Sequence, residues 1–138
     1  MNYIKTDYLS RCIIILEKSY SLLVCAEQDS IDYDIFRNSV VKSFEMTLEQ
    51  SGKLLRKKLT QYFATKQAVD ELSFKDIFRY ALKHSLLTED EVARWFKYRD
   101  NRNNTAHNYG QKFAEETLTL VSSLISDARK VQEIISHD

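Results

Sequence analysis

The scarcity of backbone breakers constrains the fold of this chain more than any other feature, since its 138 residues include two glycines and no proline. Glycine and proline are the residues that most often end helices and form tight turns. Long, uninterrupted helices are therefore expected. The length is that of about one domain, and it allows a hydrophobic core to be buried without disulfides or a metal. We expect a single domain over residues 1–138.

Apolar residues recur at spacings of three and four in three long segments, a pattern that predicts amphipathic helices. The first segment, about 4–27, carries Leu9, Ile13, Leu16, Tyr20 and Leu23. The second, about 32–65, carries Val41, Phe44, Leu48, Leu55, Leu59 and Tyr62, interrupted at Ser51 and Gly52. The third begins after Gly110 and carries Leu118, Val121, Ile125, Ala128, Val131 and Ile135.

Two shorter helices are predicted from their start signals. Ser73 stands three residues before Asp76, and Thr88 stands three residues before Glu91, a spacing typical of helix N-termini. These signals predict helices near 74–84 and 89–100. No segment alternates polar and apolar residues as a strand would. The expected fold is an all-α, up-and-down antiparallel bundle of three long helices plus a short pair.

The overall charge excludes a general nucleic-acid binder, because 20 basic and 20 acidic residues cancel. Any contact with RNA must therefore be local. Between Arg94 and Lys112 the only acidic residue is Asp100, so this stretch carries an excess of positive charge. A second basic cluster consists of Lys53, Arg56, Lys57 and Lys58, which we interpret as a solvated helix face.

Neither a disulfide nor a membrane segment is expected. Cys12 and Cys25 lie on one predicted helix, where thirteen residues separate them by roughly 20 Å, beyond the reach of a disulfide. The N-terminal residues lack the order of a signal peptide, and no apolar run is long enough to cross a bilayer. These features predict a cytoplasmic protein.

The segment from Arg102 to Tyr109 is the part of the sequence whose side chains best suit catalysis. Arg102 stands five positions before His107, and Tyr109 follows two positions later. A histidine with a pKa near ~6.5 can serve as acid or base, and an arginine presents a planar fork of donors to phosphate oxygens. By itself, a histidine five residues after an arginine is more often a surface or capping residue. Asn103, Asn104 and Asn108 equally suit a turn between helices.

Cleavage of RNA without a metal needs a base for the ribose 2′-hydroxyl, a positive charge at the phosphate and an acid for the departing 5′-oxygen. One His107 and one Arg102 provide too few groups for these three tasks. A symmetric homodimer with the two segments face to face would supply two of each. No metal-ligand spacing, glycine-rich phosphate loop or nucleophile elbow occurs, so no metal or cofactor is expected.

The segment from Arg102 to Tyr109 resembles the Arg, four residues, His, one residue, Tyr signature of HEPN-domain proteins of the HepT toxin type, also described as nucleotidyltransferase substrate-binding proteins. The similarity covers about residues 35–125. It includes Phe44-Glu45, Leu48-Glu49, Lys53-Leu54 and Leu59 in the second long helix, and Phe78-Arg79-Tyr80-Ala81, Leu86-Leu87 and Trp95 before the motif.

The resemblance implies a HEPN-like helical homodimer and a metal-independent endoribonuclease whose catalytic Arg102 and His107 come from both subunits. Arg99 and Asn103, which flank Arg102, are assigned as supporting phosphate-binding residues. The resemblance also implies a type VII toxin–antitoxin pair in which an MNT-type nucleotidyltransferase antitoxin transfers AMP to the motif tyrosine, here Tyr109. Such a modification would add bulk and phosphate charge beside His107.

The sequence departs from this family pattern at two places. His84-Ser85 replaces a glycine that often precedes the Leu-Leu pair, and Gly110 follows the tyrosine where a polar or acidic residue is commoner. Two other readings stay open. One is a non-catalytic substrate-binding subunit of a two-component nucleotidyltransferase, and the other is a purely structural helical dimer. The sequence does not identify the RNA target or the cleavage sequence.

Overall fold

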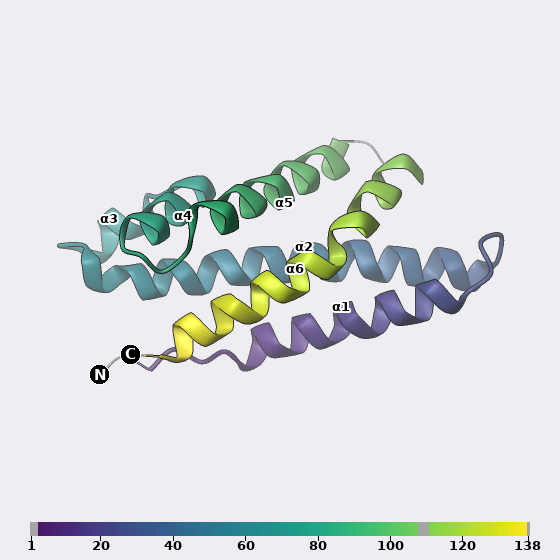
Figure 1. The fold of residues 1–138 in the computed structure, drawn as a ribbon, viewed down its shortest axis with the longest axis horizontal. Coiled ribbons are helices and arrows are strands. Elements are labelled where there is room, and N and C mark those ends of the chain that lie inside the picture. Colours follow the sequence, from purple (N-terminus) through teal and green to yellow (C-terminus); the bar gives the residue numbers. More distant parts are fainter. Residues whose placement is uncertain (1–2, 108–110, 138) are drawn as a thin grey trace.

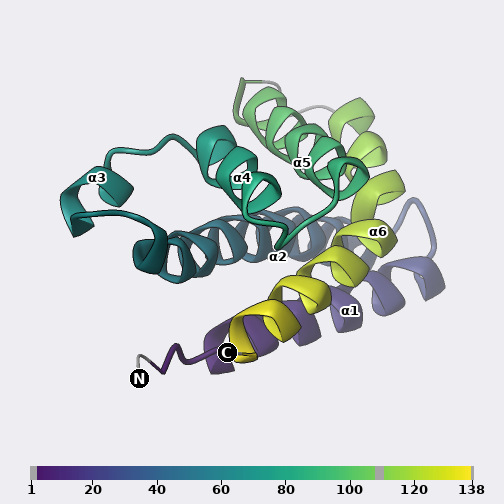
Figure 2. The same ribbon diagram turned by 60° about the vertical axis from the view of Figure 1, so that its left-hand side comes forward.

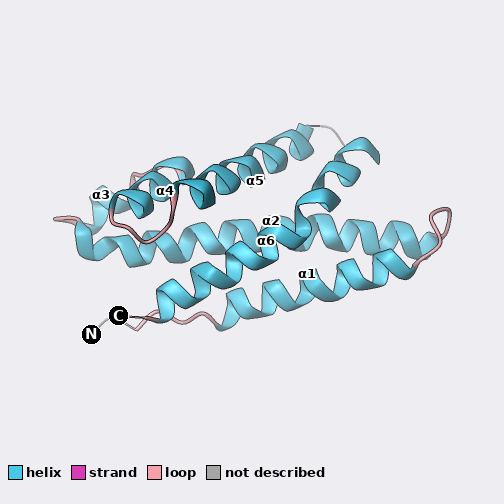
Figure 3. Ribbon diagram, in the orientation of Figure 1, coloured by secondary structure: helices cyan, strands magenta, loops and turns pink. Residues whose placement is uncertain are grey.

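The computed structural model describes the backbone of residues 3–107 and 111–137, and the side chains of residues 3–102 and 115–137. Its elements, in chain order, are α1 (Asp7–Cys25), α2 (Ile31–Leu59), the 3-10 turn η1 (Thr60–Tyr62), α3 (Lys66–Asp70), α4 (Phe74–Lys83), α5 (Glu89–His107) and α6 (Gln111–Ser136). In the described ranges the regular structure is entirely helical, as Figure 3 shows, and the all-α prediction is confirmed.

The helices form an antiparallel bundle built around α2, the longest of them (Figure 1). α1 and α2 run in opposite directions along their length, and α6 returns beside α1, so that the start of α1 and the end of α6 lie at the same end of the bundle (Figures 1 and 2). The shorter α4 and the longer α5 cover another side of α2. This arrangement places α5, which carries the motif arginine, against both α2 and α6.

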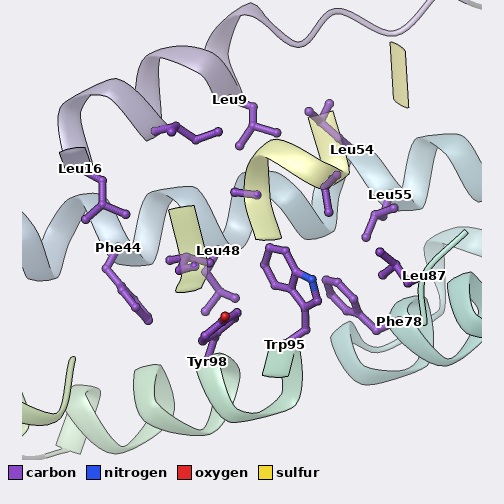
Figure 4. Close-up of a cluster of buried hydrophobic side chains, with 14 of the residues drawn as sticks. Leu9, Leu16, Phe44, Leu48, Leu54, Leu55, Phe78, Leu87, Trp95 and Tyr98 are labelled. Carbon is purple, nitrogen blue, oxygen red and sulfur yellow. The ribbon is translucent and has the colours of Figure 1, made fainter. Parts of the chain in front are cut away.

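The predicted apolar stripes form the core (Figure 4). In the first stripe Leu9, Ile13, Leu16 and Leu23 are buried. In the second stripe two positions were wrong, because Val40 is buried while Val41 is only partly covered, and Tyr62 is 41% exposed. The largest side chains without solvent contact come from α2, α4 and α5 and are Phe44, Phe78, Trp95 and Tyr98.

The predicted start signals are formed. The amide of Asp76 donates to Oγ of Ser73 (3.1 Å) at the start of α4. At the start of α5 the amide of Thr88 donates to Oε1 of Glu91 (2.9 Å), and the amide of Glu91 donates to Oγ1 of Thr88 (3.2 Å). This reciprocal pair satisfies two amides that have no partner within the helix.

The second helix is shorter than the predicted 32–65. α2 ends at Leu59, a single 3-10 turn follows, and Phe63 is extended. Thr65 then caps the short helix α3, because its Oγ1 accepts from the amide of Ala68 (3.2 Å), and a side chain that caps a new helix competes with continuation of the old one. Helix α3 was not predicted, since five residues are too few to show a periodic pattern.

The fifth helix is longer than the predicted 89–100. α5 continues to His107, so Arg102 to His107 lie on a helix and the interpretation of this segment as a turn was wrong. No glycine or proline occurs between residues 89 and 107, and asparagine costs a helix only a few tenths of a kcal/mol relative to most other residues. The fold therefore has four long helices, rather than three with a short pair, in its described part.

Ser85, where the sequence departs from the family pattern, lies in the turn after α4. Ser85 has φ of 61°, the left-handed region in which glycine is usual. The amide of Ser85 donates to the carbonyl of Leu82 (3.0 Å), and the amide of Leu86 donates to that of Ala81 (2.8 Å). These two bonds form the Schellman motif that ends a helix. A side chain thus occupies the position for which a glycine is best suited.

Candidate functional site

Arg102 lies where α5 crosses the polar side of α2. Its Nη2 is 2.8 Å from Oε1 of Glu49 and 3.4 Å from Oε1 of Glu45. Glu45 and Glu49 are one helical turn apart on α2, so both carboxylates reach the same guanidinium nitrogen. Among the described side chains, the ion pairs of Arg102 occupy Nη2 only. The side chain is 28% exposed and therefore remains open to a ligand.

Arg99 continues this cluster one turn toward the start of α5. Its Nη1 is 3.8 Å from Oε1 of Glu49, and its guanidinium carbon lies 4.8 Å from the centre of the Phe74 ring. A cation above an aromatic face is attracted by the negative charge of that face. Arg99 and Arg102 thus share one carboxylate, and we call Glu45, Glu49, Arg99 and Arg102 the motif cluster.

The helix that carries Arg102 is fixed to α6 by polar side chains that bond to the buried Asp127 and Thr117. Arg94 donates to both oxygens of Asp127 (2.9 Å each), and the hydroxyl of Tyr98 donates to Oδ2 of the same carboxylate (2.5 Å). Asn101, which directly precedes Arg102, donates from Nδ2 to Oγ1 of Thr117 (2.9 Å). These bonds fix the rotation of α5 about its axis, and so the direction in which Arg102 points.

The buried network at Asp127 changes the ionisation of its two donors. Burial and the hydrogen bond to Asp127 raise the pKa of the Tyr98 hydroxyl, and the paired carboxylate raises the pKa of Arg94. Both shifts favour the protonated forms of these groups. Trp95 and Tyr98 are core residues, and Trp95 stacks on Phe78 with ring centres 4.9 Å apart.

The structure describes only part of the predicted site. Of the predicted residues, Arg99 and Arg102 lie together, with both guanidinium groups on Glu49. The side chains of Asn103 and His107 and the whole of Tyr109 lie outside the described residues. The sequence reasoning missed the role of Glu45 and Glu49. The two glutamates and the two arginines each span about one helical turn, but neither segment shows which turn of α2 lies against which turn of α5.

The part of the chain that the structure describes shows no metal site, no disulfide and no membrane-spanning helix. No group of three or more histidine, cysteine or carboxylate side chains is arranged to hold a metal there. Cys12 is buried, Cys25 is exposed and both are free thiols, which confirms that they do not form a bridge. None of the helices in the described ranges combines the length and the apolar character needed to cross a membrane.

The fold and the motif cluster define a class of protein: an all-α bundle with an Arg-x4-His-x-Tyr segment whose arginine is held by two carboxylates. The family model described as nucleotidyltransferase substrate-binding protein like matches residues 8–136. This chain belongs to that family.

The chain is also similar to a named relative and to two solved structures. The chain is 34% identical over 87 residues to a probable ribonuclease HepT of Haemophilus influenzae, an alignment that spans 63% of this chain and 58% of the relative. The Haemophilus influenzae protein HI0074, described as having the fold of a substrate-binding domain of a nucleotidyltransferase, superposes with a TM-score of 0.81 at 23% identity over 96% of this chain and all of the other. A crystal structure of a Thermus thermophilus protein gives a TM-score of 0.73 at 21% identity, over 94% of this chain and 99% of that one. These structures share the fold.

Proposed function

We propose that this protein is a metal-independent endoribonuclease of the HepT type, the toxin of a type VII toxin–antitoxin pair. The observation that carries the proposal is Arg102, a partly exposed cation held on the surface of α2 by Glu45 and Glu49, at the first position of the motif. The relative named as a probable ribonuclease HepT supports the same activity.

The proposed reaction is an internal transesterification of RNA. His107 accepts the proton of a ribose 2′-hydroxyl, whose oxygen attacks the neighbouring phosphorus. The bond to the 5′-oxygen breaks, and that oxygen takes a proton from a second, protonated histidine. The products are a 2′,3′-cyclic phosphate and a 5′-hydroxyl. Arg102 stabilises the charge that develops on the phosphate oxygens, with Nε and Nη1 as the donors that its described ion pairs leave available.

The helical course of α5 supports a site shared by two subunits. Residues five apart on an α-helix are rotated by about 140° from one another around its axis. Arg102 faces α2, so the position of His107 lies on a different side of α5 from that of Arg102. One chain is poorly suited to direct both residues at one phosphate. A homodimer whose motifs face each other supplies the His107 of each subunit and the Arg102 of its partner.

The proposed regulation uses Tyr109. An MNT-type nucleotidyltransferase would transfer AMP to its hydroxyl, two residues after His107. The added phosphate would bring negative charge to the motif that contains Arg102, and the nucleotide would add bulk where RNA would bind. The family to which this chain belongs is related to nucleotidyltransferases by name, which supports a partner of this kind.

The second candidate function is a non-catalytic subunit that binds a substrate for a separate nucleotidyltransferase. The family description and that of HI0074 favour it. The motif cluster would serve this function equally well, because an arginine held by carboxylates binds a nucleotide phosphate whether or not cleavage follows. The two functions differ in whether the phosphodiester bond breaks.

The deciding experiment incubates the purified protein with single-stranded RNA in the presence of a chelator. Wild type is compared with Arg102→Ala, His107→Ala and the control Arg79→Ala, which removes an exposed arginine paired with Asp76 on α4. We expect cleavage by wild type and by the control, and a loss of about 100-fold or more in the two motif variants. RNA that is bound but stays intact with wild type would favour the substrate-binding subunit instead.

Two further measurements test the homodimer and the transfer of AMP to Tyr109. Solution mass at micromolar concentration should be that of a dimer, and a monomer would remove the shared site. Co-expression with the nucleotidyltransferase should add the mass of AMP to a peptide that contains Tyr109. Tyr109→Phe should abolish the modification, whereas the exposed Tyr62, changed to phenylalanine as a control, should not affect it. Modification that persists in Tyr109→Phe would refute this step.

A further inference from the structure

A pocket of about 660 Å³ lies beside the motif cluster, and the proposed reaction does not use it. Its walls come from the middle of α2, the start of α4, Tyr8 near the start of α1, and Arg99 on α5. A volume of this size is in the range of small-molecule sites and exceeds what a single side chain would fill. We call it the α2–α4 pocket.

The α2–α4 pocket begins where the motif cluster ends. Arg99 and Glu49 belong to both, and Glu49 also holds Arg102. Arg99 and Arg102 are separated by a rise of about 4.5 Å along α5, less than the distance between successive phosphates of an extended RNA strand. A strand with one phosphate at Arg102 that continues toward Arg99 would place its neighbouring nucleotide at this pocket.

The pocket is lined by three cations, Lys53, Arg56 and Arg99, and by one carboxylate, Glu49. Two of these cations are already engaged. Arg56 donates to the carbonyls of Val69 (2.8 Å) and Asp70 (2.9 Å), and Arg99 pairs with Glu49. Lys53 is exposed and has no ion-pair partner among the described side chains. It is the cation of the pocket for which no carboxylate or carbonyl competes with a phosphate among the described residues.

Two aromatic rings line the same pocket, and one of them has a free surface. Phe74 is packed on Phe78 with ring centres 4.7 Å apart, and the guanidinium of Arg99 covers it. Tyr8 is 51% exposed. Bases of single-stranded RNA stack on exposed aromatic side chains, and such stacking tolerates any base. In one pocket, an exposed tyrosine can stack on the base of a nucleotide and an available lysine can bind its phosphate.

We propose that the α2–α4 pocket binds the nucleotide next to the cleaved phosphate in single-stranded RNA, with Lys53 on its phosphate and Tyr8 against its base. This inference rests on the proposed function, because the strand is assumed to have one phosphate at Arg102. It makes Lys53 and Tyr8 binding residues that do not take part in the chemistry. The basic cluster around Lys53 is then more than a solvated helix face.

The test measures binding without cleavage. A fluorescent single-stranded RNA of eight nucleotides is titrated with His107→Ala protein, which binds without cleaving. Its dissociation constant is compared with those of double variants that also carry Lys53→Glu, Tyr8→Ala or Lys18→Glu. Lys18 is an exposed lysine on α1 that does not line the pocket, so it controls for the change in net charge. We expect about tenfold weaker binding with Lys53→Glu and with Tyr8→Ala, and a change of about twofold or less with Lys18→Glu. Thermal melting verifies that each variant is folded.

The outcomes separate the pocket from the nuclease. Equal effects of Lys53→Glu and Lys18→Glu would overturn the pocket proposal even if wild type cleaves RNA. Loss of binding specific to Lys53 and Tyr8 would uphold the pocket as an RNA-binding site even if wild type leaves RNA intact, in which case the nuclease proposal fails and the phosphate at Arg102 is bound without being cleaved. A polyglutamate peptide of matched charge that displaces the RNA as well as unlabelled RNA does would show a general anion site, and would also overturn it.

Discussion

The carboxylate of Glu49 on α2 lies 2.8 Å from Nη2 of Arg102 on α5, so that the arginine proposed to act on phosphate is already held by a negative charge. Such a contact restricts the guanidinium to one direction, and it lowers the positive potential that RNA would meet. Orientation and attraction are thus opposed at this residue. Removing the charge of Glu49 separates the two effects.

Glu49→Gln should lower the kcat of RNA cleavage by about tenfold without raising KM. The amide holds Arg102 less firmly, so stabilisation of the transition state decreases, while the more positive site attracts RNA at least as well. Steady-state cleavage kinetics provide the measurement, and Glu133→Gln on the exposed side of α6 is the control for net charge. A raised KM with unchanged kcat would contradict a positioning role.

Ser85→Gly should stabilise the protein by about 1 kcal/mol, because a residue with a Cβ pays a steric cost at φ of 61° that glycine avoids. The control is Ser122→Gly on the exposed face of α6, where glycine should destabilise the helix by about 0.5 kcal/mol. Denaturant titration measures both changes. Two destabilised variants would show that the turn after α4 does not need a left-handed residue.

Gly52→Ala should destabilise the protein by about 1 kcal/mol, although alanine is the better helix former. A Cβ at this position would lie 2.8 Å from Cε2 of Phe74, whose ring is confined by Phe78 and Arg99. The matched background is Phe74→Ala, which removes the obstacle. There the same change should stabilise the protein, and the sign reversal is measured by a double-mutant cycle. Equal effects in both backgrounds would exclude the steric explanation.

The stability of the protein should decrease in alkali through Tyr98. Burial, with the bond to Asp127, raises the pKa of Tyr98 above its ordinary value of 10.0. The unfolded phenol therefore ionises first, so this contribution to stability is complete below about pH 10 and is lost as the pH rises toward the higher pKa of the folded state. The difference in unfolding free energy between wild type and Tyr98→Phe should be constant up to about pH 9 and shrink above pH 10.

Comparison with Tyr62→Phe, which removes an exposed phenol, isolates the effect of burial. The other tyrosines and the lysines are common to all three proteins, so their titration cancels in the differences. A difference between wild type and Tyr98→Phe that is the same at pH 9 and pH 11 would show that the folded and unfolded phenols ionise together.

The sequence was sufficient to predict the fold where the signal was local. The stripe of Leu9, Ile13 and Leu16 and the capping pair of Thr88 and Glu91 are each contained in a few neighbouring residues, and each was confirmed. The end of α2 was wrong because Thr65 begins a new helix there, and helical periodicity does not reveal a competing cap. The asparagines near Arg102 were mistaken for a turn because their preference for turns is weaker than the continuity of α5.

The site was predictable only in part. Arg102 and Arg99 were selected by their residue types, and the structure places both on Glu49. The acidic partners could not be selected in the same way, because α2 carries several carboxylates and only the packing of α5 on α2 determines which of them meet an arginine. The roles of Asn103, His107 and Tyr109 remain predictions, since their side chains are outside the described residues.

The hydrogen bonds between α5 and α6 have a further consequence. Arg94, Tyr98 and Asn101 follow one another at about one-turn intervals, and each bonds to α6 through Asp127 or Thr117. The two helices should therefore open as one cooperative unit in native-state hydrogen exchange, rather than separating from the ends. The amides of α5 around Tyr98 and those of α6 around Asp127 should share one opening free energy, and Asp127→Asn should lower it for both helices together.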